Sequence, residues 1–114
     1  MIIRQGDTYS LPATILIDGE PIVIENVDVV EFTFGHIIKI YGTIEGADEE
    51  EEPTVGTVTF SEGSFIIPFT QEETFSLDPR NIEYQARIKF IDGDVRGTCI
   101  RKGSVFESLS QTIL

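Results

Sequence analysis

Apolar and polar residues alternate from Ile82 to Phe90, and this alternation constrains the fold more than any other part of the sequence. Because successive side chains of a strand point to opposite faces, the pattern predicts a strand with one buried and one solvated face. Asp92-Gly93 follows closely, and Asp-Gly between two extended segments is a strong hairpin signal. We therefore expect the chain to turn back and pair with the segment from Val95 to Ile100, whose odd-numbered residues would share one face.

A short helical turn is predicted just before this strand, near residues 70–76. Thr70 and Glu73 have the spacing of a capping box. In such a box the threonine hydroxyl accepts a hydrogen bond from the Glu73 amide, and the Glu73 carboxylate accepts one from the Thr70 amide. Asp78-Pro79 disfavours helical geometry, so the helix should end after one or two turns.

Extended segments are predicted over most of the remaining chain. Alternation from Thr8 to Ile17 predicts a strand, and Asp18-Gly19 supplies the positive φ of a tight turn into a second strand at Ile22–Ile24. Pro68 lacks an amide donor, so its end of a strand should lie at a sheet edge or beyond the ladder. The other predicted extended segments are residues 30–34, 37–41, 55–60, 65–69, 105–109 and 112–114, with a turn at Gly35 or His36 and another at residues 61–63.

Short strands separated by Gly- and Asp-containing turns predict an all-β fold, an antiparallel β-sandwich of about 7–9 strands. The sequence shows no helical patterns between successive strands, which a parallel sheet would require. A sandwich is favoured over a small barrel because Ile22–Ile24 and Ile37–Tyr41 lack the alternation of an up-and-down barrel. At 114 residues the chain is expected to form one domain, residues 1–114, since typical domains contain roughly 100–150 residues.

The sequence is strongly acidic, with 20 Asp and Glu, 8 Lys and Arg, and a formal net charge of −12. Binding to phosphate requires clustered basic residues, so neither nucleic acid nor an anionic membrane is expected as a partner. The segment Met1–Gly6 lacks a basic region followed by an apolar run, and no stretch of about 18 apolar residues occurs, so neither secretion nor membrane insertion is expected. Residues 43–53 contain four consecutive glutamates and should form a mobile loop.

Two acidic segments offer several of the carboxylate oxygens that Ca²⁺ prefers. The run from Asp48 to Glu52 lacks the alternating ligands and central glycine of a calcium loop, so a solvated loop is favoured. Asp92-Gly93-Asp94 offers two carboxylates, but its position between two strands favours a turn. We therefore predict no metal site and no cofactor.

The residue types that most often carry catalysis form no complete set. His36 is the only histidine, no serine lies in a G-x-S-x-G elbow, and a strand-end histidine is the favoured interpretation. Cys99 is the only cysteine, which fits a reducing compartment, and it is interpreted as a small core residue on the inward face of its strand. Glu72-Glu73 lacks the fixed separation that glycoside hydrolysis needs, and Glu73 is assigned to the helix cap. No catalytic residue is predicted.

Three segments of the chain resemble a family of small proteins encoded by tailed phages and prophages of Gram-positive bacteria. They are Ile3-Arg4-Gln5-Gly6-Asp7-Thr8, Pro68-Phe69-Thr70-Gln71-Glu72-Glu73-Thr74, and Tyr84-Gln85-Ala86-Arg87-Ile88 followed by Asp92-Gly93. The chain is also similar, more distantly, to the N-terminal domain of baseplate upper proteins, an immunoglobulin-like sandwich that docks into the tail tip. This resemblance implies an immunoglobulin-like β-sandwich and a structural role in a virion.

The expected function is that of a non-enzymatic tail or baseplate-associated virion protein, acting through protein–protein contacts. Its partners would be other phage structural proteins, or further copies of itself in a homo-oligomer, and it would pass from the bacterial host cytoplasm into the assembled virion. Candidate seams are Ile37–Tyr41, which is apolar on both faces, and the C-terminal Gln111–Leu114. The alternative is a small-ligand or host-surface carbohydrate-binding module that uses Tyr41 or Tyr84.

Overall fold

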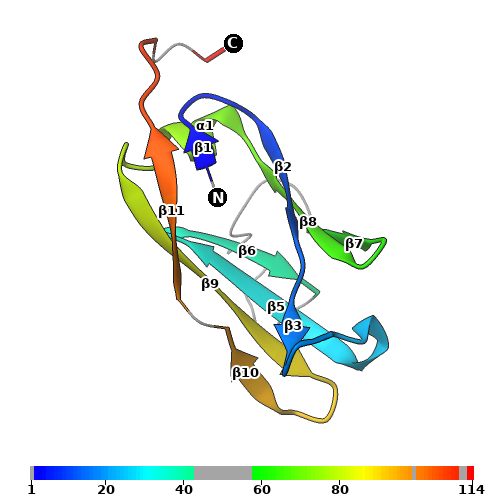
Figure 1. Cartoon of the computed structure of the whole chain (residues 1–114). Helices are drawn as coiled ribbons and strands as arrows, with labels where there is room; N and C mark the ends of the chain where they lie inside the picture. Colours follow the sequence, from blue (N-terminus) through cyan, green and yellow to red (C-terminus); the bar gives the residue numbers. More distant parts are fainter. Residues whose placement is uncertain (1, 43–57, 99, 111–112) are drawn as a thin grey trace.

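The computed structural model describes residues 2–42, 58–98, 100–110 and 113–114. In these residues the chain forms an all-β sandwich of two facing sheets, with a short α-helix and a 3₁₀ turn between strands (Figure 1). The elements are β1 (Ile2–Arg4), β2 (Tyr9–Ala13), β3 (Leu16–Ile17), β4 (Glu20–Pro21), η1 (Ile24–Asn26), β5 (Val27–Phe34), β6 (Ile37–Tyr41), β7 (Thr59–Ser61), β8 (Ser64–Phe69), α1 (Gln71–Phe75), β9 (Asn81–Phe90), β10 (Val95–Gly97) and β11 (Arg101–Phe106).

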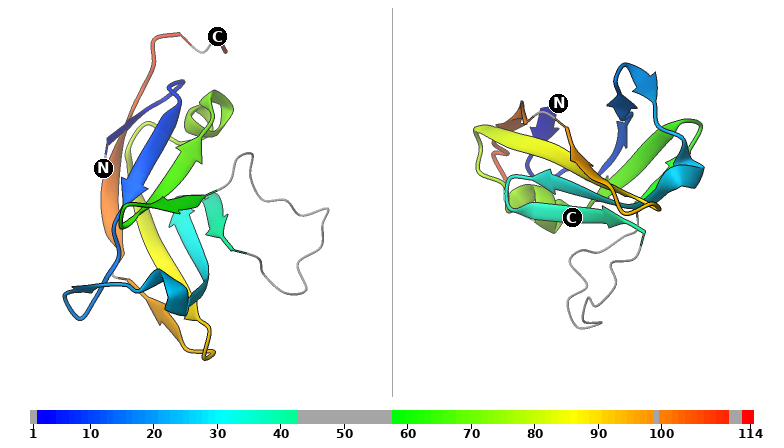
Figure 2. Two further views of the ribbon diagram at one scale, coloured as in Figure 1. Left: turned by 90° about the vertical axis from the view of Figure 1, so that its right-hand side faces the viewer. Right: turned by 90° about the horizontal axis from the view of Figure 1, so that it is seen from below.

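The larger sheet has the order β1-β11-β9-β5-β6, and β10 pairs with β9 beside β11. Its most extensive pairing joins β5 to β9, from Val27 opposite Phe90 to Phe34 opposite Tyr84. The smaller sheet has the order β2-β8-β7. Figure 2 shows these sheets as two layers, with the β3–β4 hairpin at one end of the sandwich.

This strand order is that of an immunoglobulin-type sandwich. The run β11-β9-β5-β6 corresponds to strands G-F-C-C′ of the variable-type domain, and β2-β8-β7 corresponds to B-E-D. The described strands outnumber the expected seven to nine because β3 and β4 have two residues each and β10 and β11 share one edge of β9. One pair departs from the expected antiparallel sandwich, since β1 runs parallel to β11.

Aromatic side chains from both sheets form the centre of the core. Phe65 of β8 is fully buried and lies edge-on to Phe32 of β5, with ring centroids 5.4 Å apart. Phe34 and Phe69 make the same kind of contact at 5.1 Å. Burial of these rings removes a large apolar area from water, which is the main favourable term for a sandwich of this kind.

The predicted helix and its capping box are confirmed. α1 begins after Thr70, whose hydroxyl accepts from the Glu73 amide at 3.2 Å, while the Glu73 carboxylate accepts from the Thr70 amide at 2.9 Å. The helix has five residues, within the predicted one or two turns. Thr74 is buried, and its hydroxyl ties the helix to the turn after β1 through Gly6 and Asp7.

The predicted turns at Asp18-Gly19 and at residues 61–63 are also confirmed. Asp18 and Gly19 both have positive φ angles, as do Glu62 and Gly63. Paired positive φ values are those of a type I′ turn, whose twist matches that of antiparallel strands. Pro68 pairs with Ser10 of β2, while β7 pairs with β8 only as far as Ile66. The other side of Pro68 therefore lies beyond the ladder, as expected.

Two predicted strands near the N-terminus have wrong boundaries. The segment Thr8–Ile17 is divided, because the pairing of β2 with β8 ends at Ala13 and Leu16–Ile17 pair with β4 instead. The strand predicted at Ile22–Ile24 is instead Glu20–Pro21, followed by the 3₁₀ turn. This turn, closed by a hydrogen bond from the Asn26 amide to the Val23 carbonyl, redirects the chain into β5.

The strand predicted to begin at Ile82 is confirmed and spans Asn81–Phe90, but its hairpin partner faces the opposite way from the prediction. Val95 lies opposite Lys89 on the outer face and is 52% exposed, so the odd-numbered residues of this partner do not face the core. The Phe90 amide bonds to the Asp94 carbonyl, which leaves three residues in the loop instead of two. A shift of one residue moves every side chain of the returning strand to the other face.

The last strand also differs from its prediction, since β11 spans Arg101–Phe106 and ends before Leu109. Ile113 and Leu114 are exposed and belong to no described strand. Figure 1 shows the chain after β11 extending beyond the sheets at the end that carries α1. The predicted loop at 43–53, Cys99, and the first two residues of the seam Gln111–Leu114 lie outside the described residues.

Candidate interaction site

A groove of about 860 Å³ opens between the two sheets, beside β2 and β3 on one side and β9 to β11 on the other. Its floor is apolar and includes Leu11, Phe32, Phe34, Tyr84 and Ala86. Phe32 and Phe34 are core residues, whereas Leu11 and Tyr84 are half-buried. The groove therefore gives access to one flank of the hydrophobic core.

Local strand pairing explains why the sandwich is open here. β2 pairs only with β8 among the described strands, so its other edge faces the groove. Across the groove, β10 and β11 pair one after the other with the same edge of β9. The pairing is interrupted after Gly97, where β10 ends, and resumes at Arg101, where β11 begins. At this interruption Thr98 takes the place of a strand residue, because its amide donates to the Ala86 carbonyl and its Oγ1 accepts from the Ala86 amide.

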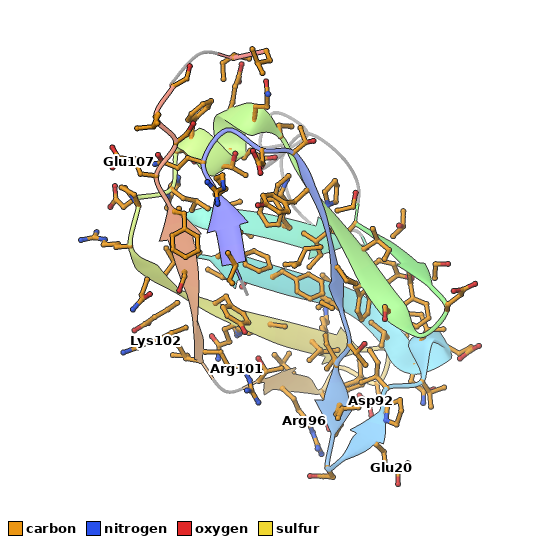
Figure 3. The ribbon with its side chains drawn as sticks, turned by 45° about the horizontal axis from the view of Figure 1, so that its top comes forward. Glu20, Asp92, Arg96, Arg101, Lys102 and Glu107 are labelled. Carbon is orange, nitrogen blue, oxygen red and sulfur yellow. The ribbon has the colours of Figure 1, made fainter. Side chains whose placement is uncertain are left out.

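Two arginines stand beside this opening. Arg96 pairs opposite Ile88 and Arg101 opposite Tyr84, so both come from the inward face of the sheet, and both are exposed. Figure 3 shows them on either side of the β10–β11 interruption, with Arg96 near the β3–β4 hairpin. Arg96 lies 3.9 Å from the Asp18 carboxylate, an exposed pair that contributes little stability.

The seam predicted at Ile37–Tyr41 forms β6, which pairs only with β5 among the described strands and lies at the sheet edge. Isoleucine side chains lie on both faces of this strand. Ile38 and Ile40 lie on the outer face, opposite Thr33 and Glu31, and Ile38 is 39% exposed. Ile37 is buried on the inner face.

Lys39 also points inward from β6, and its side chain is fully buried. Its Nζ lies 2.7 Å from the Glu73 carboxylate and 5.1 Å from the centre of the Phe69 ring. The same carboxylate caps α1, so one ion pair connects the edge strand to the helix. Buried charges persist only when paired and hydrogen-bonded, which makes this contact a structural one.

His36 is exposed in the turn between β5 and β6, and its Nε2 lies 3.0 Å from Ser76 Oγ. The Ser76 hydroxyl donates to the Glu73 carbonyl, so its oxygen is left to accept from the imidazole. A nucleophilic serine requires the opposite arrangement, in which the histidine accepts the hydroxyl proton. The predicted strand-end histidine is confirmed, with a serine partner that lies 40 residues away in sequence.

The acidic turn after β9 is held by its own backbone. Asp92 Oδ1 accepts from the Asp94 amide at 2.9 Å, and Gly93 has a φ of 97°. This Asx turn confirms the predicted turn at Asp92-Gly93-Asp94. Within residues 2–42, 58–98, 100–110 and 113–114, no group of three or more His, Cys, Asp or Glu side chains could hold a metal ion.

The two tyrosines considered for ligand binding lie in different settings. Tyr84 is half-buried in the groove, with its ring stacked on Phe34 at 6.0 Å. Tyr41 is half-buried at the edge strand and lies edge-on to Phe65 at 5.1 Å. Both rings are therefore committed in part to the core, and Tyr84 alone of the two lines the groove.

Sequence reasoning identified neither the groove nor the buried ion pair. The alternation of Ile37, Lys39 and Tyr41 does place Lys39 on the apolar face, and this was the available signal for an inward lysine. Its partner Glu73 lies 34 residues away, and no periodicity connects the two. The arginines of the groove could not be assigned to the inner face because the length of the hairpin loop was predicted wrongly.

Comparison of the chain with models of protein families, with curated proteins and with solved structures gave no match. In the parts of the chain that the structure describes, no helix is both long and apolar enough to cross a lipid bilayer.

Proposed function

We propose that this protein is a non-enzymatic structural component of a tailed phage or prophage virion, associated with the tail or baseplate. The proposal rests on the family resemblance of its sequence segments and on an all-β sandwich that offers surfaces for protein–protein contact. It places the chain in the bacterial host cytoplasm after synthesis and in the virion after assembly.

The observation that carries the proposal is the combination of open strand edges and the apolar groove. Both β2 and β6 have one described partner each, and an unpaired edge is a template for pairing with another chain. Exposed apolar side chains lie near the edges of the larger sheet, among them Ile38 of β6 and Ile2 of β1. Such residues are typical of surfaces that are covered in an assembly.

The test is co-expression of the affinity-tagged chain with the tail and baseplate proteins of its own phage or prophage, followed by electron microscopy of released particles. We expect the chain to co-purify with a defined tail protein and to be labelled by antibody at the tail. An Ile38→Asp variant should weaken that association if the β6 edge is the contact, whereas Ile113→Asp tests the C-terminal seam. A strict monomer that no structural protein retains, and that is missing from particles, would contradict the proposal.

The second candidate, a small-ligand or carbohydrate-binding module, is favoured by one observation, the position of Tyr84 in the groove. A half-buried aromatic ring beside polar groups is a common element of ligand sites. A glycan array separates the two candidates. Saturable binding of a defined glycan that Tyr84→Ala abolishes would establish the binding module.

A further inference from the structure

The groove between β2 and the β10–β11 edge differs in charge from the rest of the chain. The chain has a formal net charge of −12, yet Arg96, Arg101 and a single carboxylate, Asp18, are the charged residues that line the groove. Both arginines are exposed, and Arg96 lies 3.9 Å from the exposed Asp18 carboxylate. Weak exposed pairs of this kind exchange readily for a better-placed carboxylate.

The floor of the groove favours an extended occupant. The opening runs between two strand edges, β2 on one side and β10–β11 on the other, and its base includes Leu11, Ala13 and Tyr84. In an extended chain alternate side chains point to opposite faces. One set would therefore reach the apolar floor while the other set faces solvent beside the arginines.

We propose that this groove binds an extended segment of a partner protein in which apolar residues alternate with acidic ones. The apolar residues would cover the exposed side of the hydrophobic core beside Phe32 and Ala86. The acidic residues would pair with Arg96 and Arg101. Arginine suits this role because its planar guanidinium group binds a carboxylate through two parallel hydrogen bonds. This inference rests on the proposed function and specifies the chemistry of the partner.

One feature of β2 limits how the backbone of such a segment can pair. Pro12 lines the groove and has no amide hydrogen, so it removes one donor from the β2 edge. β10 carries no proline, and its outer edge has no described partner. Backbone pairing is therefore assigned to β10, and β2 contributes apolar contacts.

The test uses a short fluorescein-labelled peptide in which valine alternates with glutamate, together with a peptide in which lysine replaces each glutamate. Fluorescence anisotropy of the acidic peptide with the full chain should show saturable binding, and the lysine peptide should not bind. The double variant Arg96→Glu/Arg101→Glu should lower affinity at least about tenfold, which corresponds to about 1.4 kcal/mol. Both arginines are exposed, so the fold should survive the substitutions.

A matched control is Arg87→Glu/Lys102→Glu, which changes the net charge equally on the outer face of the same sheet. These residues lie opposite Glu31 and Glu83 and away from the groove. The control should leave affinity within about twofold, because exposed charges on the far face are screened by salt. In NMR spectra, peptide addition should shift the resonances of Ala13, Tyr84 and Ala86.

Four outcomes would overturn the inference: no binding of the acidic peptide, equal binding of the lysine peptide, equal losses in both double variants, or shifts confined to β6. A dimer of the chain alone that Arg96→Glu/Arg101→Glu abolishes would place a second copy in the groove and overturn the assignment to a partner. Failure here is distinguishable from failure of the proposed function. A chain that ignores the peptide but still joins the tail retains that function through another surface.

Discussion

Lys39 is the residue whose environment departs most from its type, because a lysine side chain with no exposed surface is rare. The ion pair with Glu73 is the reason that it can remain inside. The Glu73 carboxylate has two tasks at once, since it accepts from Lys39 and caps α1 by accepting from the Thr70 amide. Loss of either charge would leave the other in a largely dry site.

We predict that Lys39→Met lowers the free energy of unfolding by about 3 kcal/mol, because it leaves a mostly buried carboxylate without its cation. Adding Glu73→Gln to Lys39→Met should recover at least about 1 kcal/mol, since the double variant carries no unpaired charge. Urea denaturation followed by circular dichroism measures both. The free-energy cost of Glu73→Gln alone is measured as well. If Glu73→Gln costs as much unfolding free energy in the Lys39→Met background as in the unaltered protein, the two side chains are not coupled.

A glycine is required at Gly42, which directly follows β6, because of its backbone conformation and its surroundings. Its φ is 88°, and a Cβ there would clash with the Asp28 carbonyl oxygen, which is part of β5 and cannot move freely. We predict that Gly42→Ala costs about 3 kcal/mol of unfolding free energy. Gly63→Ala is the matched control, with a φ of 83° and no atom within 4 Å, and should cost about 1 kcal/mol. Equal costs in thermal melts would rule out the backbone contact.

At the scale of elements, the structure shows which local signals are sufficient. The Thr70–Glu73 box, the Asp18-Gly19 turn and the alternation of β9 all act within a few residues, and all three are present as predicted. The hairpin after β9 shows where a local signal is insufficient. Asp92-Gly93 is compatible with loops of two or three residues, and the difference decides which face of β10 meets the core.

Removal of the Thr70 cap should destabilise α1 by a measurable amount. Thr70→Ala removes the side chain that accepts from the Glu73 amide, and we expect a loss of about 1 kcal/mol in unfolding free energy. Thr70→Ser keeps the hydroxyl and should cost less than about 0.5 kcal/mol. Chemical denaturation of the two variants gives the comparison. Equal stability of the alanine and serine variants would show that the hydroxyl does not hold the helix.

At the scale of the whole molecule, Phe65 links the two sheets. It belongs to β8 and contacts the rings of Phe32 and Tyr41 in the facing sheet, as well as Phe60 in its own. Because this ring is shared, neither sheet can keep its core face covered if the other unfolds. The sandwich should therefore unfold as one cooperative unit.

Phe65→Ala is expected to lower the free energy of unfolding by about 4 kcal/mol, because it removes a fully buried aromatic side chain and leaves a cavity. Phe106→Ala, at a ring 48% exposed, should cost less than about 1 kcal/mol. Urea unfolding of the unaltered protein, followed by both circular dichroism and tyrosine fluorescence, should give coincident curves. Separate transitions would show that the two sheets are independent.

The sequence alone determined the all-β class, the helix cap, most of the turns and the inner faces of β5 and β9, because period, turn chemistry and capping act between near neighbours. Only the tertiary structure decided the parallel pairing of β1 with β11, the Lys39–Glu73 ion pair and the arginine-lined groove. Each of these joins residues far apart in the chain. Their contacts depend on which strands become neighbours and in which register, and a periodic pattern carries no information about either.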